Sequence, residues 1–134
     1  MFKEVHYIMV TVSDMKRSIE FYRDKLGLPL KFESPGWTEF QTGASTLALH
    51  GGGKPQPGPV EPANETPYAG TCSIGFSSTD LEKTCEELKA RGVHFVMPPT
   101  RRDQEGILLA VCADPDGLPV SFAQMLDGAE PAHE

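Results

Sequence analysis

Two ionisable side chains, Glu39 and His50, are the candidates in this sequence for acid–base chemistry. A carboxylate and an imidazole can each transfer a proton near neutral pH when their surroundings tune them. Both lie in segments whose residues predict short β-strands, Trp37–Thr42 and Ser45–His50. Because side chains alternate between the two faces of a strand, Glu39 shares a face with Trp37. A catalytic pair and two solvated residues at the rim of a cavity both fit this pattern.

The three cysteines, Cys72, Cys85 and Cys112, are a second group with chemical potential, but they lack CxxC spacing. Each falls within an apolar pattern, which predicts buried thiols that act as small hydrophobic side chains. Unpaired, reduced thiols are typical of a cytoplasmic protein. Reactive or metal-bound thiols are the alternative, although no sequence neighbour is suited to activating them.

The first half of the chain predicts a strand, a helix and three more strands. Val5–Val12 is rich in β-branched residues and predicts a buried strand. Ser13 and Asp14 can cap a helix that Gly27 ends. The apolar positions of this helix recur at helical spacing, at Met15, Ile19, Tyr22 and Leu26. Three short strands follow, at Leu28–Glu33, Trp37–Thr42 and Ser45–His50.

A segment rich in glycine and proline, Gly51–Pro67, separates the two halves. It holds four Gly and five Pro among seventeen residues, which predicts a linker that forms a mobile flap near the cavity mouth. The same order of elements then begins again, because a shift of 66 residues places Asp14 on Asp80. The second half predicts one helix, Leu81–Gly92, and four strands, at Thr71–Ser78, Val93–Met97, Ile107–Cys112 and Pro119–Gln124.

The repeat predicts an α+β fold of paired βαβββ modules, with the helices on the convex side of curved sheets. The modules span residues 5–50 and 71–125 of a single domain, 1–134, with the linker 51–67 between them and a polar tail at 126–134. One helix covers only one face of a short sheet, so two modules side by side can cup a concave surface.

Composition and charge exclude several classes of function. With 39% hydrophobic and 23% charged residues the chain can bury a core, so global disorder is excluded. A net charge of −7 disfavours binding to nucleic acid. Apolar runs such as Ile107–Ala113 fall far short of the about 20 residues that span a bilayer, and no signal-peptide pattern is visible. We therefore expect a cytoplasmic protein with neither a nucleic-acid nor a membrane partner.

Three segments in this order carry a resemblance to a known superfamily. They are V-x-V-S-D-M-x-x-S-I-x-F-Y-x-x-x-L-G-L at Val10–Leu28, the helix Asp80–Gly92, and the D-P-D-G turn before the last strand. Together they resemble the vicinal-oxygen-chelate superfamily, which includes glyoxalase I, extradiol dioxygenases, and fosfomycin- and bleomycin-resistance proteins. The resemblance runs from Val5 to Met125 and implies the paired-module fold. It leaves the reaction open, because members run many chemistries on one scaffold.

The resemblance also implies where a metal would bind, at four positions of the concave face that usually hold His or Glu. These positions match Tyr7, Ala48 (or His50 if the register slips by two), Ser73 and Ser121. A divalent metal needs three or four His, Cys or carboxylate donors, so we expect no metal cofactor. His6 lies one residue from a ligand position, and only a bulge would turn it to that face. We expect His6 at the edge of the core.

The concave face is therefore predicted to bind an unidentified small molecule. Aromatic rings, hydroxyls and two ionisable groups suit a flat or amphipathic ligand. The predicted contact residues are Tyr7, Trp37, Glu39, His50, Ser73 and Ser121. Trp37 has an alternative role, as a hydrophobic plug at a dimer or module seam.

Three classes of function fit these expectations. The first is a metal-free protein that sequesters a small molecule, as the bleomycin-resistance proteins do. The resemblance of this chain to those proteins also implies a homodimer. The second is an enzyme, either a lyase or isomerase that uses Glu39 or His50, or a dioxygenase-like metalloenzyme whose ligands are misassigned above. The third is an interacting or regulatory protein with a vestigial cavity. The residues at the four metal positions favour the first class.

Overall fold

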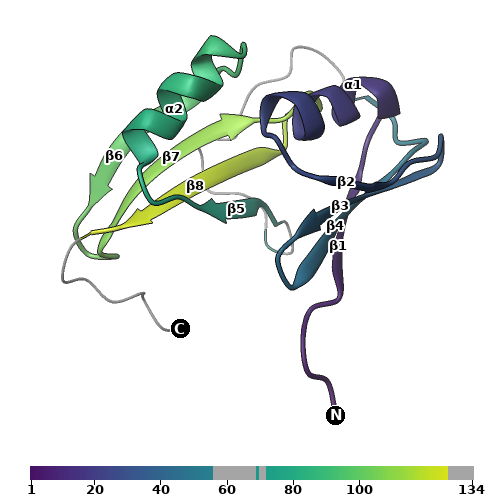
Figure 1. The fold of residues 1–134 in the computed structure, drawn as a ribbon, viewed down its shortest axis with the longest axis horizontal. Coiled ribbons are helices and arrows are strands. Elements are labelled where there is room, and N and C mark those ends of the chain that lie inside the picture. The colour runs from purple at the N-terminus through teal and green to yellow at the C-terminus, as the bar shows by residue number, and fades with distance from the viewer. Residues whose placement is uncertain (56–68, 70–71, 127–134) are drawn as a thin grey trace. The chain divides into compact units, whose positions relative to one another are not determined.

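The computed structural model describes residues 1–55, 69 and 72–126 of the chain. Contacts divide the chain into two units, Met1–Val60 and Glu61–Glu134. Each unit has a four-stranded mixed sheet and one helical region after its first strand (Figure 1). The predicted α+β class and the repeated βαβββ order are therefore confirmed.

The first unit has the strand order β1-β4-β3-β2. β1 pairs in parallel with β4, while β4 with β3 and β3 with β2 are antiparallel. The strands are β1 (Tyr7–Thr11), β2 (Leu30–Phe32), β3 (Trp37–Thr42) and β4 (Ser45–His50). Thr38 and Phe40 of β3 are fully buried, as alternation predicts, so Trp37 and Glu39 lie on the opposite face.

The helical region of the first unit changes character along its length. Asp14 caps α1 (Met15–Ile19) by accepting a hydrogen bond from the Arg17 backbone nitrogen at 3.1 Å. The helix continues as a π-helix, η1 (Glu20–Lys25), closed by the Leu26 nitrogen donating to the Phe21 oxygen. The wider turns bury Phe21 beside Tyr22, and Phe21 was not among the apolar positions that the helical spacing predicted.

This helical region covers one face of its own sheet. The Tyr22 ring lies 6.1 Å from the ring of Phe40 on β3, which joins η1 to the buried side of the sheet. Gly27 follows with a φ of 79°, a left-handed conformation that ends the helix as predicted.

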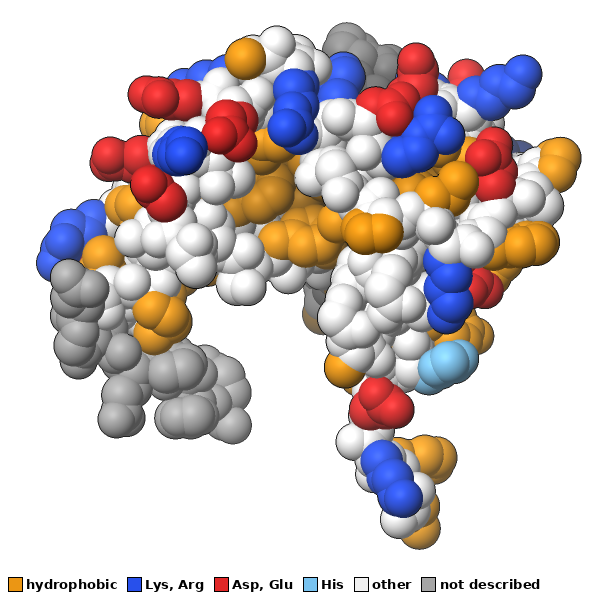
Figure 2. Space-filling model, viewed as in Figure 1, with side chains coloured by type: hydrophobic (Ala, Val, Ile, Leu, Met, Phe, Trp, Pro, Cys, Tyr) orange, Lys and Arg blue, Asp and Glu red, His pale blue; other side chains and the backbone are white. Residues whose placement is uncertain are grey.

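The second unit repeats this arrangement, with the strand order β5-β8-β7-β6 and β5 parallel to β8. Its elements are β5 (Ile74–Ser77), α2 (Leu81–Ala90), β6 (Phe95–Arg102), β7 (Ile107–Ala113) and β8 (Pro119–Met125). α2 packs on β6, β7 and β8 through the buried side chains of Leu81, Cys85 and Leu88. On the face drawn in Figure 2, acidic and basic side chains are interspersed over the helices.

The D-P-D-G segment forms the predicted turn between β7 and β8. The side chain of Asp114 is buried, and its Oδ1 accepts hydrogen bonds from the backbone nitrogens of Asp116 at 2.9 Å and Leu118 at 2.8 Å. Gly117 has a φ of 91°, which an L side chain rarely adopts. The turn therefore depends on one buried carboxylate and one glycine.

Two predictions of burial were wrong. β1 was expected to be buried, but Tyr7, Ile8 and Met9 are 49%, 41% and 48% exposed. Within the described residues β1 pairs with β4 alone, so it is an edge strand with no neighbouring strand on its other side. Cys72 was also expected to be buried, but it precedes β5 and is exposed, whereas Cys85 and Cys112 are buried as predicted.

β6 is longer than the predicted strand Val93–Met97. It runs to Arg102 through Pro98 and Pro99, and its pairing with β7 shifts register twice on the way. Proline donates no hydrogen bond and is accepted at the edge of a sheet, which is the position of β6. Two adjacent prolines indicate a break in most other settings, so the sequence does not indicate this extension of the strand.

The predicted flap, Gly51–Pro67, lies mostly outside the described residues, as does the polar tail beyond Leu126. Its first residues belong to the first unit. The Gly51 nitrogen donates to the Gly36 oxygen, and the Gly53 nitrogen donates to the Val12 oxygen, each at 3.0 Å. The flap remains a prediction for the rest of the segment. Among the described residues, no helix has the length and hydropathy needed to cross a membrane.

Candidate ligand-binding site

The candidate site is the face of the first sheet that points away from Phe40 and the helical region, called the open face below. The pairing of β1, β4 and β3 arranges its side chains in three rows across the strands. Read from β1 through β4 to β3, the rows are Tyr7–Thr46–Gln41, Met9–Ala48–Glu39 and Thr11–His50–Trp37. Side chains in one row or in adjacent rows are close enough to interact.

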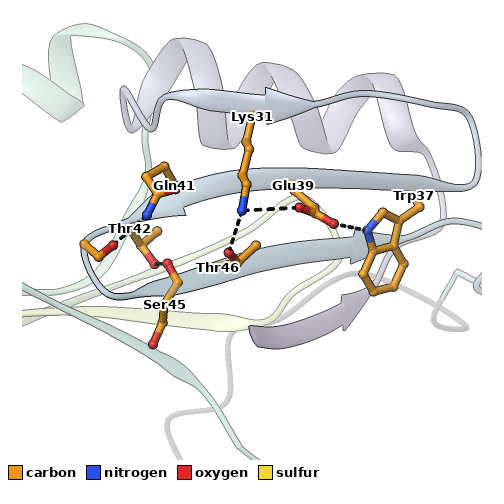
Figure 3. A network of polar contacts seen from close by, with 8 residues as sticks. Lys31, Trp37, Glu39, Gln41, Thr42, Ser45 and Thr46 are labelled. Carbon is orange, nitrogen blue, oxygen red and sulfur yellow. Dashed lines mark hydrogen bonds and ion pairs between the residues drawn. The ribbon is translucent and has the colours of Figure 1, made fainter. Parts of the chain in front are cut away.

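A polar network crosses the open face (Figure 3). The indole nitrogen of Trp37 donates to Oε2 of Glu39 at 2.7 Å. The Lys31 ammonium, from β2, lies 3.8 Å from Oε1 of Glu39 and 3.5 Å from Oγ1 of Thr46. The indole contact has the length of a charge-assisted hydrogen bond, whereas both lysine contacts are long. The Trp37–Glu39 pair is therefore the fixed part of the network.

Three aromatic side chains lie on the same face as the network. The Tyr7 and Trp37 rings meet edge to face with their centroids 5.9 Å apart, and the His50 ring lies 6.2 Å from Trp37. Tyr7 and Trp37 pair with Thr46 and His50 on β4, so their contact passes over Ala48, the residue halfway between. Ala48 is fully buried, which is consistent with a ring pair that covers it.

The structure brings four of the six predicted contact residues onto this face: Tyr7, Trp37, Glu39 and His50. Ser73 and Ser121 belong to the second unit, where Ser73 is exposed and the hydroxyl of Ser121 donates to the Ile74 oxygen at 3.4 Å. The candidate site is therefore built here from the first unit.

Lys31 also lies on the open face, although the sequence did not lead us to expect it among the contact residues. The signal was present, because Lys31 lies between two apolar residues of a strand, Leu30 and Phe32, and alternation places it on the opposite face from them. Its ammonium balances the charge of Glu39 across the network. The open face thus carries one positive and one negative side chain near Trp37, within a chain whose net charge is −7.

The residues at the superfamily's metal positions do not fit a divalent metal. Ala48 has no ligand atom, Tyr7, Ser73 and Ser121 offer only neutral hydroxyls, and His50, the alternative to Ala48, would be a single imidazole. In the described part of the chain, no three His, Cys, Asp or Glu side chains gather closely enough to hold an ion. His6 is exposed rather than at the edge of the core, and its ring stands edge-on to Tyr7 at 5.7 Å.

The buried thiols of the second unit are inert at neutral pH. Burial, together with the charge of nearby Asp114, raises the pKa of Cys112 to about 12. Burial also raises the pKa of Cys85. Because the thiolate is the reactive form, neither group is a nucleophile under ordinary conditions.

A separate hollow of about 650 Å³ lies beside the start of α1. It is lined by Ser13–Lys16, Ile19 and Glu33–Pro35, so it shares no residue with the open face. The carboxylate of Asp14 already caps the helix there. The hollow is wide open to solvent and lacks the aromatic side chains that bind flat ligands, so the open face remains the better candidate.

Comparison with known proteins shows the same fold. The solved glyoxalase/bleomycin resistance protein/dioxygenase from Nocardioides has a TM-score of 0.75 at 22% identity, covering 100% of this chain and 91% of that chain. TnmS3, an antibiotic binding protein from Streptomyces sp. CB03234, has a TM-score of 0.71 at 22% identity, covering 92% and 97%. Both likenesses confirm the expected fold.

Comparison of sequences shows the family. The chain is 25% identical over 125 residues to a Synechocystis sp. protein named probable lactoylglutathione lyase, covering 88% of this chain and 92% of that protein. The sequence model of the superfamily expected from the motifs matches residues 4–122. The chain therefore belongs to the Glyoxalase/Bleomycin resistance protein/Dioxygenase superfamily.

Proposed function

We propose that this protein binds a small, flat molecule on the open face of the first sheet and does so without a metal ion. The observation that carries the proposal is the hydrogen bond from the Trp37 indole to Glu39, which fixes an aromatic side chain beside a polar network. Aromatic surface supplies contact area for a flat ligand, and a few placed polar groups orient it. TnmS3, which shares the fold, is described as an antibiotic binding protein, and this supports the binding class.

An enzyme is the second candidate, favoured by the similarity to the Synechocystis protein named as a lyase. Glu39 or His50 would then transfer the proton in a lyase or isomerase reaction. Both carboxylate oxygens of Glu39 face donors of the chain itself, Trp37 and Lys31. Because its oxygens already contact these two side chains, Glu39 serves to orient Trp37 more than to accept a proton from a substrate. Binding is therefore the preferred proposal.

A homodimer in the cytoplasm is part of the same proposal. β1 is an edge strand that exposes Tyr7, Ile8 and Met9, and an exposed apolar edge is covered in most soluble proteins. Light scattering should give about twice the 14.6 kDa mass of the chain. A mass near 14.6 kDa at micromolar concentration would contradict the dimer. The three free cysteines support the cytoplasmic location.

The binding proposal can be tested with one internal reporter, because Trp37 is the single tryptophan of the chain. Its indole N–H gives one cross-peak in a heteronuclear NMR spectrum, and 2-naphthamide serves as an uncharged flat probe. We expect the cross-peak to shift saturably, equally with and without EDTA. Tyr7→Phe should weaken binding by about 0.5–1.5 kcal/mol, the value of one lost hydrogen bond, and Tyr7→Ala by more because ring contact is lost as well. Binding that EDTA abolishes and one metal restores would overturn the proposal.

A further inference from the structure

We propose that Lys31 makes the open face selective for flat ligands that carry an acidic oxygen, such as an aromatic carboxylate or phenolate. The inference rests on the proposed function, because it names the ligand class for the same site. Nothing in the family's metal positions involves Lys31, which comes from β2 rather than from β1 or β4.

The Lys31 ammonium is weakly bonded in the ligand-free site. It has three N–H donors, yet its contacts to Thr46 and Glu39 measure 3.5 Å and 3.8 Å. A lysine that meets a carboxylate well does so at about 2.7–2.9 Å. The Lys31 side chain is also 46% exposed, so a ligand can reach it without breaking the hydrogen bonds of the network.

Glu39, in contrast to Lys31, already has a short hydrogen bond and is less exposed. Its Oε2 accepts the short bond from Trp37, and its side chain is 28% exposed. A cationic ligand would have to displace the Lys31 ammonium or lie beside it, whereas an anionic ligand adds a second partner to an ammonium with unused donors. The network therefore presents donors to the ligand more readily than acceptors.

The position of Lys31 also fits a ring that carries the acidic group. Its ammonium lies near Thr46, which shares a row with Tyr7, while Trp37 lies two rows away on the same face. A carboxylate held by Lys31 would place the attached ring toward Tyr7 and Trp37, the two aromatic side chains that contact each other. The net charge of −7 repels anions at long range, but salt at about 0.15 M screens that repulsion beyond about 8 Å.

The test uses three probes of nearly equal shape: 2-naphthoate (anionic), 2-naphthamide (neutral) and 2-naphthylmethylammonium (cationic). Dissociation constants come from the Trp37 indole cross-peak at about 0.15 M salt. For the natural sequence we expect 2-naphthoate to bind about three- to tenfold more tightly than 2-naphthamide, with the cation weakest. Lys31→Gln should abolish this preference, and Lys31→Arg should keep it.

Lys83→Gln is the matched control, because it removes the same charge from an exposed position on α2. It should leave the preference intact. If Lys31→Gln retains the preference for 2-naphthoate, or if the cation binds best to the natural sequence, the inference is overturned. Binding of 2-naphthamide with no preference for 2-naphthoate defeats the inference and leaves the proposed function standing. If no probe moves the indole cross-peak, both fall.

Discussion

The indole nitrogen of Trp37 lies 2.7 Å from Oε2 of Glu39, a residue two places further along the same strand. Residues separated by two share a face of a strand, so this bond lies along β3 and depends little on the rest of the fold. It fixes the orientation of the Trp37 ring, which in turn meets Tyr7 and His50. One local bond therefore orients the aromatic part of the open face.

Removing the acceptor should loosen the site and the sheet together. Glu39→Ala leaves the indole N–H of Trp37 without its partner and should lower the free energy of unfolding by about 1–2 kcal/mol. Glu39→Gln keeps an acceptor oxygen and should cost less than half of that. Urea unfolding followed by circular dichroism measures both, with Glu86→Ala on the exposed side of α2 as a control expected within about 0.5 kcal/mol of the natural protein. Equal losses for Ala and Gln at position 39 would show that the acceptor does not matter.

Gly51 should tolerate no side chain, in contrast to Gly36. A Cβ at Gly51 would lie 2.7 Å from the Pro35 carbonyl oxygen, whereas a Cβ at Gly36 would meet nothing within 4 Å. The Pro35 carbonyl belongs to the backbone and cannot move aside as the end of a flexible side chain can. Gly51→Ala should therefore cost about 1–3 kcal/mol of stability, and Gly36→Ala about 0.5 kcal/mol or less. Thermal unfolding of the two variants decides the point. Similar melting temperatures for both would refute the close approach between β4 and the β2–β3 connection.

The β7–β8 turn should depend on the carbonyl-type oxygen of residue 114 rather than on its charge. Oδ1 of Asp114 accepts both backbone hydrogen bonds, so Asp114→Asn can preserve them and Asp114→Ala cannot. We expect a loss of about 2–3 kcal/mol for Ala and a much smaller loss for Asn, measured by urea unfolding. Asp103→Ala, which removes an exposed partner of Arg101, should change stability little. If Asp114→Asn lowers the stability as much as Asp114→Ala does, the turn depends on the negative charge of Asp114 and the prediction is wrong.

Alkaline conditions should destabilise the protein through Cys112. Its pKa rises from an ordinary 9.0 to about 12 in the folded state, so above pH 9 the unfolded chain loses the thiol proton while the folded chain keeps it. The unfolded state then binds fewer protons, and the free energy of unfolding falls by about 1.4 kcal/mol per pH unit up to the folded pKa. Cys112→Ala removes this slope. Its stability deficit relative to the natural protein should therefore shrink by about 2–3 kcal/mol between pH 9 and pH 11.

The sequence predicted those features that depend on local periodicity. Alternation placed Trp37 and Glu39 on the face opposite Phe40, and the cap at Asp14 marked where the first helix begins. These features follow from geometry within a few residues, which a single sequence contains. The superfamily followed from the same local patterns arranged in order.

The remaining features depend on which strands become neighbours. Tyr7 and Met9 are exposed because β1 lies at an edge, and nothing within Val5–Val12 states how many partners that strand will have. The ring contact between Tyr7 and Trp37 requires β1 and β3 to flank β4, a pairing over more than thirty residues of sequence. Lys31 joined the site for the same reason, since its ion pair with Glu39 exists only because β2 lies next to β3.

The measurement that tests the central claim most directly is a map of backbone amide shifts on titration with 2-naphthamide. Binding at the proposed site should concentrate saturable shifts on the open face, at β1, β3 and β4, with the largest near Tyr7, Trp37 and His50. Shifts confined to the hollow beside α1, at Ser13–Lys16 and Glu33–Pro35, would place the ligand outside the open face and contradict the proposed site.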